Sequence, residues 1–465
     1  MMIKQECSVM GRFCTAIFIL FLGVLVSAGE VFLFQTTDLH GMIHNSGGIS
    51  GAPSVLQAVA EDADRLGRDK SILIDCGDLL QGSLESADDQ GYKMIFLLNA
   101  ARYDIWVPGN HDFEFGRTVF TERIRSFKGN VLAANLRFPS VKPYHIFRKN
   151  GYKIAIIGMT NPHLDKWIFR PEKEGFHVSP LEHAYRKILP ELLREKPDAI
   201  ILAVHSGLYP SKRLGDEGLF AFSRKHPEIQ LVLGGHTHEK VVCKRLGRSG
   251  ACYFQAGAHG GGYIRVRLDF DDKTGKLRAI TGEYIPVPPK KRIAEPFMMH
   301  HAIRRPVVTG NFPVNASPKQ IAGRFAEAIL KGFPEAAGVF HGVLTNFQPK
   351  YPVLNRLHLF HLCPFENKVV LAKITRAEYE EILREQESAA EKYKMEQYFF
   401  LRGTDDPWSG DPDRRVTIAF NSYAAASAGG RFPILKKILN RPESQAVLKD
   451  KRVFDLLEKS LGENK

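Results

Sequence analysis

The sequence predicts an α/β protein built from two parts. Short apolar runs such as "SILIDCGD", "YKIAIIGMT" and "IQLVLGGHTH" alternate with amphipathic stretches over residues 53–66, 92–101 and 181–194. Strands that alternate with helices favour a layered α/β architecture. A chain of 465 residues is too long for one compact core. We therefore expect a large α/β unit followed by a smaller one.

The first thirty residues have the form of a secretory signal peptide. Lys4 and Arg12 precede an apolar stretch over residues 13–26, and small residues at 26–28 resemble a cleavage site. The alternative is a short membrane anchor, for which the apolar stretch is rather short. We expect residues 1–28 to be removed, leaving a secreted or periplasmic protein without a stable membrane span.

Cysteine usage agrees with export. Cys243 and Cys252 flank "KRLGRSGA", which joins two strand-like runs, so we expect cross-strand neighbours in a hairpin and a disulfide in an oxidising compartment. Cys76, inside "SILIDCGD", is typical of a buried free thiol.

The net charge of +13 indicates attraction to polyanions or phosphorylated substrates. The sequence contains no RNA-binding motif or zinc-finger spacing, so no nucleic-acid polymer is expected as a partner.

A Pro- and Lys-rich segment, "IPVPPKKRIAEP", interrupts the pattern and is typical of a domain linker. From Val314 the chain begins again with a helical stretch and alternates as before. The expected organisation is therefore a first domain over 29–289, a linker over 290–313 and a second domain over 314–465.

Polar residues follow the predicted strands of the first domain. They are Asp38 and His40, then Asp78, then Asn110, His111 and Asp112, then His205, and finally His236 and His238. Taken singly, Asp and Asn after a strand are turn formers. Ligands collect at the carboxyl ends of strands in α/β sheets, so these scattered residues can converge. Five such places in one domain indicate a common site.

The residue types suit a particular chemistry. Carboxylates, imidazoles and one amide oxygen, without a thiolate, favour zinc, manganese or iron. Seven ligands exceed what one tetrahedral ion needs and suit two divalent ions with a carboxylate between them. Two such ions generate a hydroxide near neutral pH and hold the oxygens of a phosphoryl group.

These motifs, over residues 31–289, resemble the five sequence blocks of calcineurin-like metallophosphoesterases. The resemblance implies an αββα sandwich with two metal ions. One ion would be held by Asp38, His40 and His238, and the other by Asn110, His205 and His236. Asp78 would bridge the two ions, while His111, oriented by Asp112, would act as the acid at the leaving group.

The second half is similar to the C-terminal domain of secreted 5′-nucleotidases. "LNRLHLFHLCPFENKVVLAKITRAEYEEIL" carries the Pro-aromatic-x-Asn segment of that domain, and "TIAFNSYAAASAGGRFP" is similar to its other base-binding loop, in the style of 2′,3′-cyclic-nucleotide 2′-phosphodiesterases. The resemblance implies a substrate-binding domain in which Phe365 and Tyr423 sandwich a nucleobase. The alternative is that both are core aromatics beside strands.

The second domain also departs from that family. "VLTNFQPKY" keeps Asn346 but lacks the arginine that grips phosphate. Lys350 offers a point charge there rather than a bidentate fork. Arg431 follows a pair of glycines where relatives often have an acidic residue. These differences leave open which substrate is used and whether Lys350 or Arg431 replaces the missing arginine.

The expected function is that of a secreted dinuclear-metal phosphomonoesterase that acts on small nucleotides, as a 5′-nucleotidase does. The alternative enzymes are a 2′,3′-cyclic-nucleotide 2′-phosphodiesterase with 3′-nucleotidase activity, a nucleotide-sugar hydrolase and a thiosulfate-ester hydrolase. A surface nucleotide-binding protein with a vestigial fold is the alternative outside enzymes, and the intact ligand set argues against it.

Overall fold

The structure is a computed structural model of the whole chain. It describes residues 29–43, 50–210, 218–246, 250–289, 306–307, 312–343, 349–350, 352–393, 396–403 and 405–462. The predicted signal peptide, Asn346 and most of the predicted linker lie outside these residues, so the domain boundaries stay a prediction. Within the described ranges, no helix combines the length and the apolar character needed to cross a bilayer.

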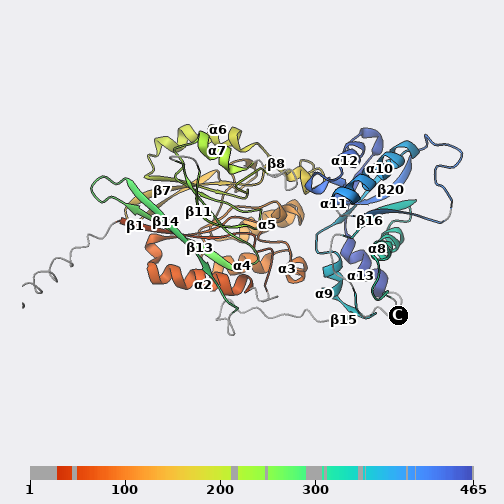
Figure 1. Cartoon of the computed structure of the whole chain (residues 1–465), viewed down its shortest axis with the longest axis horizontal. Coiled ribbons are helices and arrows are strands. Elements are labelled where there is room, and N and C mark those ends of the chain that lie inside the picture. Colours follow the sequence, from red (N-terminus) through yellow and green to blue (C-terminus); the bar gives the residue numbers. More distant parts are fainter. Residues whose placement is uncertain are drawn as a thin grey trace, which may run out of the picture.

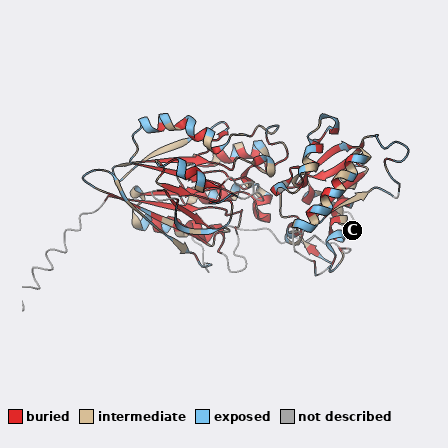
Figure 2. Cartoon of the chain, turned by 45° about the horizontal axis from the view of Figure 1, so that its top comes forward, coloured by how far each residue is buried: buried red, intermediate tan, exposed pale blue. Residues whose placement is uncertain are grey.

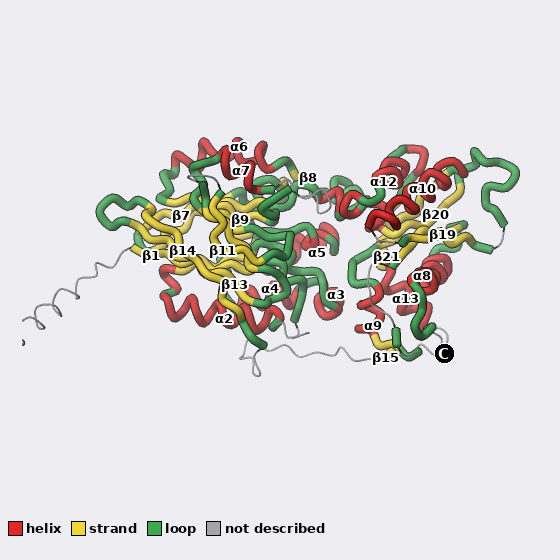
Figure 3. The backbone as a smooth tube through the Cα atoms, in the orientation of Figure 1, coloured by secondary structure: helices red, strands yellow, loops and turns green. Residues whose placement is uncertain are grey.

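The first part contains two six-stranded sheets (Figures 1 and 3). One sheet has the order β14-β13-β1-β2-β3-β4. Its strands are β1 (Gly29–Thr36), β2 (Ser71–Asp75), β3 (Ile105–Trp106), β4 (Asn130–Val131), β13 (Gly262–Phe270) and β14 (Leu277–Pro286). The other sheet has the order β11-β12-β10-β9-β7-β6. Its strands are β6 (Tyr144–Lys149), β7 (Tyr152–Met159), β9 (Ala199–Val204), β10 (Leu231–Leu233), β11 (Lys240–Arg245) and β12 (Cys252–Ala256).

Apolar side chains of the two sheets meet in a shared core. Val31, Leu33, Ile74 and Ile201 belong to this inner cluster. The outer face of the first sheet is covered by α2 (Gly51–Leu66), α4 (Tyr92–Ala100) and α5 (Gly116–Ser126). The outer face of the second sheet is covered by α6 (Leu181–Arg194) and α7 (Leu219–Lys225). The buried interior of this four-layer arrangement is visible in Figure 2. The expected αββα sandwich is confirmed.

The strands that carry the polar motifs are parallel. β1 pairs in parallel with β2, β2 with β3, and β9 with both β7 and β10. β2 and β9 are buried along their whole length, as expected for parallel strands covered on both faces. Their carboxyl ends therefore open at the same edge of the sandwich.

The second part has one five-stranded sheet in the order β19-β16-β20-β18-β21. Its strands are β16 (Gly338–Gly342), β18 (Lys368–Ile374), β19 (Gln397–Leu401), β20 (Val416–Asn421) and β21 (Val447–Arg452). One face packs on α8 (Pro318–Gly332), α9 (Arg356–Leu362) and α13 (Val453–Gly462), and the other on α10 (Arg376–Tyr393), α11 (Ser422–Ala425) and α12 (Pro433–Leu439). This confirms the smaller α/β unit.

The remaining elements are short. They are α3 (Leu84–Asp89), the strand pair β5 (Leu136–Arg137) and β8 (His177–Val178), and the strand pair β15 (Pro306–Val307) and β17 (Leu354–Asn355).

Directional contacts join the two parts. Arg170 donates to the carbonyl oxygens of Leu439 and, at 2.9 Å, Ala446, close to the end of α12. Lys436 pairs with Asp165 at 2.7 Å. At the opposite side of the interface Arg356 donates both terminal nitrogens to Asp88, at 2.7 and 2.9 Å. These contacts hold the second sheet system against the edge where the parallel strands of the first end.

The two cysteines of the predicted hairpin lie on neighbouring strands, but the expected disulfide is not formed. Cys243 Sγ and Cys252 Sγ are 3.4 Å apart and both residues are thiols. The ladder slips between Val241 and Lys244, which places Arg245 rather than Cys243 opposite Cys252. Cys243 lies in this bulge with φ +48°. Cys76 is a buried free thiol, as expected.

We expect oxidation to join Cys243 and Cys252, because the sulfurs are already neighbours. The short loop they close should stabilise the fold by about 2–3 kcal/mol. Peptide mapping and thermal unfolding with and without reductant test this. Cys243→Ser should unfold at one temperature in both conditions, and two free thiols after oxidative refolding would contradict the expectation.

Candidate dinuclear metal site

The turns that follow five parallel strands meet at one edge of the sandwich. Asp38 and His40 follow β1, Asp78 follows β2, Asn110 and His111 follow β3, His205 follows β9, and His236 and His238 follow β10. Two groups of ligand atoms lie close enough to hold an ion each: Asp38 with His40 and His238, and Asp78 with His205 and His236. These are the groupings that the family resemblance implies, apart from Asn110 and the bridging role of Asp78.

The backbone at this edge is unusual. Five candidate ligands have left-handed φ angles between +48° and +75°: Asp38, His40, Asp78, His236 and His238. Such a conformation costs a residue with a side chain about 1–2 kcal/mol. Strained residues of this kind persist where the surrounding structure requires them, and they cluster at functional sites.

Two glycines let the turns approach one another. A Cβ atom on Gly77 would lie 2.4 Å from the backbone nitrogen of Gly109, and one on Gly109 would lie 2.3 Å from Asp78 Oδ1. A side chain at either position would force these turns apart, and Asp78 would then lose its place between the ligands.

In the first group, His40 Nε2 lies 3.0 Å from His238 Nε2, and His238 Nε2 lies 3.5 Å from Asp38 Oδ1. In the second group, Asp78 Oδ2 lies 3.1 Å from His205 Nε2. The same Asp78 oxygen is 3.7 Å from His40 Nε2. Asp78 therefore reaches both groups, as a bridging carboxylate must.

Hydrogen bonds behind the ligands orient the imidazoles. His205 Nδ1 lies 2.7 Å from the Cys76 carbonyl oxygen, and His40 Nδ1 lies 3.0 Å from the Gln81 carbonyl oxygen. A carbonyl can only accept, so each Nδ1 carries a proton and each Nε2 is the nitrogen directed toward the site. Metal-binding histidines are commonly held in this way.

Unsatisfied polar atoms fit the same interpretation. Asn110 is fully buried, yet neither atom of its side-chain amide has a hydrogen-bond partner. His205 Nε2 also lacks one, although the Asp78 oxygen lies at ion-pair distance. Buried polar atoms without partners are rare in native structures. Divalent ions would satisfy these atoms, so the residues present fit two ions.

Burial sets the charges of the cluster. It raises the pKa of Asp38 to about 7 and lowers the pKa of His238 to about 4. Burial also opposes protonation of His205, but the Asp78 carboxylate raises its pKa to about 10. Ligands must be deprotonated, so metal uptake would release the protons held here.

His111 has a different acidic partner from the one expected. Its Nδ1 lies 2.6 Å from Glu114 Oε1, so Glu114 and not Asp112 is the hydrogen-bond partner of this nitrogen. Asp112 Oδ1 instead accepts from the backbone nitrogens of Leu79 and Leu80, and its Oδ2 accepts from the nitrogen of Gly109. The expectation that Asp112 orients His111 is therefore wrong. The short 3₁₀ helix His111–Phe113 turns Glu114 to the imidazole and Asp112 inward.

The electrostatics of His111 follow from this pairing. Burial opposes its protonation, but the carboxylates of Glu114 and Asp78 raise the pKa of His111 to about 9. The imidazole is therefore protonated at neutral pH, as a proton donor should be. The sequence does contain a signal for Glu114, because a Glu three residues after a His lies on the same side of a helical turn. Asp112, directly after His111, is an equally plausible partner from sequence alone.

Trp167 was not predicted either. Its ring centre is 5.5 Å from that of His111 and 5.6 Å from that of His236. It follows the 3₁₀ helix Leu164–Lys166, in a segment without ligand motifs, and no sequence signal distinguishes it from a core aromatic.

Of the two predicted base-binding aromatics, Phe365 lies beside His111 and Tyr423 lies beside Phe365. The ring centres of Phe365 and Tyr423 are 5.7 Å apart with planes 24° apart, and Phe365 is 6.5 Å from His111. Arg431 Nη1 donates to the Tyr423 hydroxyl at 2.8 Å. Lys350 is exposed, and Asn346 lies outside the described residues.

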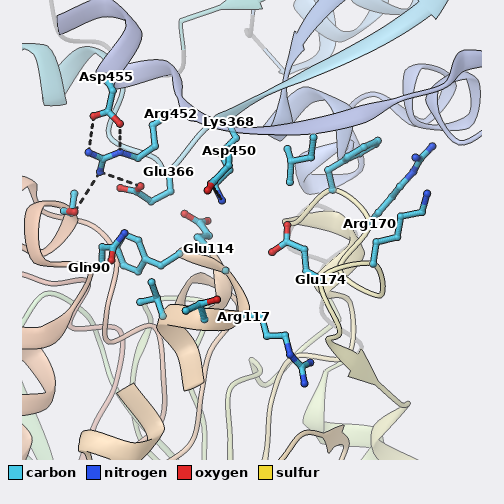
Figure 4. Close-up of a pocket in the computed structure, with 18 of the residues that line it drawn as sticks. Gln90, Glu114, Arg117, Arg170, Glu174, Glu366, Lys368, Asp450, Arg452 and Asp455 are labelled. Atoms are coloured by element: carbon cyan, nitrogen blue, oxygen red, sulfur yellow. Dashed lines mark hydrogen bonds and ion pairs between the residues drawn. The ribbon is translucent and has the colours of Figure 1, made fainter. Parts of the chain in front are cut away.

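A cleft of about 930 Å³ separates the two parts behind His111 (Figure 4). Glu114, Glu174 and Lys368 line it, and Arg452 spans to Glu366 and Asp455 at its upper wall in the view of Figure 4. Both acidic and basic side chains line the cleft. Glu114 contacts His111 on one side and forms part of this cleft on the other.

The sandwich carries two groups of candidate metal ligands at one edge. Residues 33–240 match the family model described as calcineurin-like phosphoesterase. This part of the chain is a calcineurin-like phosphoesterase domain, and domains of this family use two divalent metals.

Curated relatives share part of the chain. A 5′-nucleotidase of Vibrio cholerae is 29% identical over 293 residues, which are 56% of this chain and 52% of the relative. A 2′,3′-cyclic-nucleotide 2′-phosphodiesterase/3′-nucleotidase of Haemophilus influenzae is 26% identical over 47% of this chain and 37% of its own length. The matched region thus spans about half, or less, of these relatives.

The fold extends over the whole chain. The 5′-nucleotidase precursor of Thermus thermophilus superimposes with a TM-score of 0.63 at 17% identity, covering 94% of this chain and 97% of that one. Both the sandwich and the second α/β unit therefore have counterparts in a solved structure.

Asp78→Asn should lower the metal content from two equivalents, because an amide offers one weak ligand oxygen where the carboxylate reaches both groups. Elemental analysis of the dialysed protein measures this. Asp75→Asn is the matched control: it changes a buried carboxyl at the end of β2, just before that turn, which belongs to neither group, and it should keep both ions. Two full equivalents in Asp78→Asn would contradict a bridging role.

Glu114→Gln should lower the pKa of His111 in the metal-free protein, because the main charge that favours the imidazolium is removed. Proton NMR titration measures this. Because the pKa of His111 is higher in the folded than in the unfolded protein, its protonation stabilises the fold at any pH below the unfolded-state pKa. This stabilisation is lost as the pH rises through about 9. The difference in unfolding free energy between wild type and variant should accordingly shrink above that pH.

Asp112→Asn should behave differently, because it would set amide hydrogens against backbone N–H groups. It should destabilise the fold by about 1–3 kcal/mol and leave the pKa of His111 nearly unchanged. If the pKa of His111 instead falls in Asp112→Asn and stays unchanged in Glu114→Gln, Asp112 is the residue that orients His111.

Proposed function

We propose that the chain is a dinuclear-metal phosphomonoesterase that releases phosphate from nucleotides, as a 5′-nucleotidase does. The observation that carries the proposal is the position of Asp78, which lies between the two ligand groups and beside His111. Asp78 Oδ1 accepts from the backbone nitrogen of His111 at 2.8 Å, while its Oδ2 faces His205 and His40. Metal ligands and proton donor are thus fixed by one carboxylate.

The proposed chemistry divides between the ions and the chain. Two bound ions would supply a hydroxide near neutral pH and neutralise charge on the phosphoryl oxygens. His111 is held by Glu114 through Nδ1, so its Nε2 proton is the one available to the ester oxygen when the P–O bond breaks. Trp167, packed on His111 and His236, would limit the access of water to that proton.

Phe365 and Tyr423 support a nucleotide as the substrate. Stacking on an aromatic ring stabilises any base, because every base has a π-face. Carbon atoms in contact lie about 3.5–4.0 Å apart, so a base between two rings needs roughly 7 Å. The rings lie closer than that, at 5.7 Å. A base would therefore have to separate them, or stack on one exposed face.

A second candidate is hydrolysis of 2′,3′-cyclic nucleotides. It is favoured by the Arg431–Tyr423 hydrogen bond, which brings a cation to the base-binding loop where it can neutralise a phosphate on the ribose. We also propose, from residues 1–28, that the chain acts after export.

Release of phosphate from AMP and 3′-AMP, and of a nucleoside monophosphate from 2′,3′-cyclic AMP and UDP-glucose, each measured with and without a chelator, tests the proposal. We expect chelator-sensitive release, fastest from AMP. Binding of nucleotides without any turnover would instead support the vestigial binding protein.

Replacing Phe365 or Tyr423 by Ala should raise KM for a nucleotide by about 10- to 100-fold, the loss of one stacking partner. Turnover of p-nitrophenyl phosphate should hardly change, because it has no base. The double variant should lose little more than the worse single one, since coupled contacts are not additive. Equal losses on both substrates, with lower thermal stability, would indicate core packing and remove much of the case for a nucleotide.

A further inference from the structure

A third histidine lies beside the first ligand group. His259 follows β12, in a loop that carries none of the predicted motifs. Its ring centre is 5.4 Å from that of His40 and 5.3 Å from that of His238. For comparison, the ring centres of His40 and His238 are 4.9 Å apart, and those of His205 and His236 are 5.2 Å apart. The distances from the His259 ring to the rings of His40 and His238 are thus nearly the same as the distances between the two imidazoles within each group.

The backbone ties His259 to the same group. Its nitrogen donates to the carbonyl oxygen of Asp38 at 2.8 Å. It has a left-handed φ of +58°, a conformation that five candidate ligands share. Gly260 follows it at φ +76°, where a Cβ atom would lie 2.8 Å from the backbone of Gly51. The loop is therefore held on both sides, by the Asp38 carbonyl and by the close approach of Gly260 to Gly51.

The side chain carries an unused ligand atom. His259 Nδ1 is buried and has no hydrogen-bond partner. His111 also lies 5.3 Å from His40, but its Nδ1 is engaged by Glu114.

We propose that His259 is an additional ligand of the first metal site, completing Asp38, His40 and His238 with a third imidazole. In the structure its nitrogens lie outside the closest group of three ligand atoms. Binding would draw the ring inward onto an ion shared with His40 and His238. The inference rests on the proposed dinuclear centre and adds a ligand that neither the family motifs nor the ligand groups include.

A third imidazole would change the selectivity of this site. Imidazole suits zinc, iron and nickel, whereas carboxylate and water suit magnesium and manganese. With three imidazoles and one carboxylate, the first site should prefer zinc over manganese. The second group has two imidazoles, one carboxylate and the amide of Asn110, and is expected to be less selective. The two sites should therefore fill in sequence when zinc is titrated.

Zinc titration of the metal-free protein against a chromogenic chelator tests the proposal. The variant is His259→Asn, because Asn tolerates a left-handed backbone but lacks the imidazole. His145→Ala, a partly buried histidine on β6, is the control. We expect two binding steps in wild type and control. In His259→Asn one step should weaken by about 10- to 100-fold, with the other step unchanged.

Cobalt provides a second readout, since its visible absorption depends on coordination number and ligand type. The spectrum of the first cobalt equivalent should change in His259→Asn. It should also change in His259→Gly, a variant that allows the same left-handed backbone and has no side-chain oxygen that could bind the ion. Unchanged affinities with a superimposable spectrum would overturn the inference and leave the dinuclear centre intact. Equal weakening of both steps would also overturn it, while failure of wild type to bind two ions would instead reject the proposed function.

Discussion

The first part depends on one electrostatic contact, between Asp78 and His205. Asp78 comes from the sheet that contains β1, β2 and β3, and His205 from the sheet that contains β9 and β10. Their side chains are 3.1 Å apart at the edge where the two sheets meet. The neighbouring features support this contact. The candidate ligands have left-handed backbones, Gly77 and Gly109 let the turns after β2 and β3 approach each other, and the carbonyl of Cys76 holds the His205 ring.

Much of this arrangement is predictable from the sequence, for a physical reason. A buried parallel strand is an uninterrupted apolar run, so "SILID" and "AIILAV" indicate both the strand and the residue at which it ends. Polar residues after such runs must lie at the carboxyl edge, and their convergence follows from topology alone. The helix over 181–194 is equally plain, because its apolar residues recur with helical spacing.

What the sequence does not provide is the direction of single side chains and the contacts between distant segments. Asp112 and Glu114 are both acidic neighbours of His111, and only the 3₁₀ turn decides which one faces the ring. His259 follows an ordinary glycine-rich turn, and its approach to His40 depends on a strand pairing more than two hundred residues away. The position of Phe365 depends likewise on interface contacts, among them Gln81, which accepts from the His40 ring and donates to the carbonyl of Pro364.

The separation of the ligands along the sequence also determines at which stage of folding the site can form. Asp38 and His238 are separated by two hundred residues, and neither group is complete until both sheets have formed and packed. Parallel sheets with long crossover connections form slowly, because the chain loses the entropy of loop closure before the stabilising contacts between strands are made. An ion therefore cannot nucleate this fold in the way that zinc nucleates a small finger domain. It must enter a sandwich that is already built, so the empty protein has to be stable without the ions.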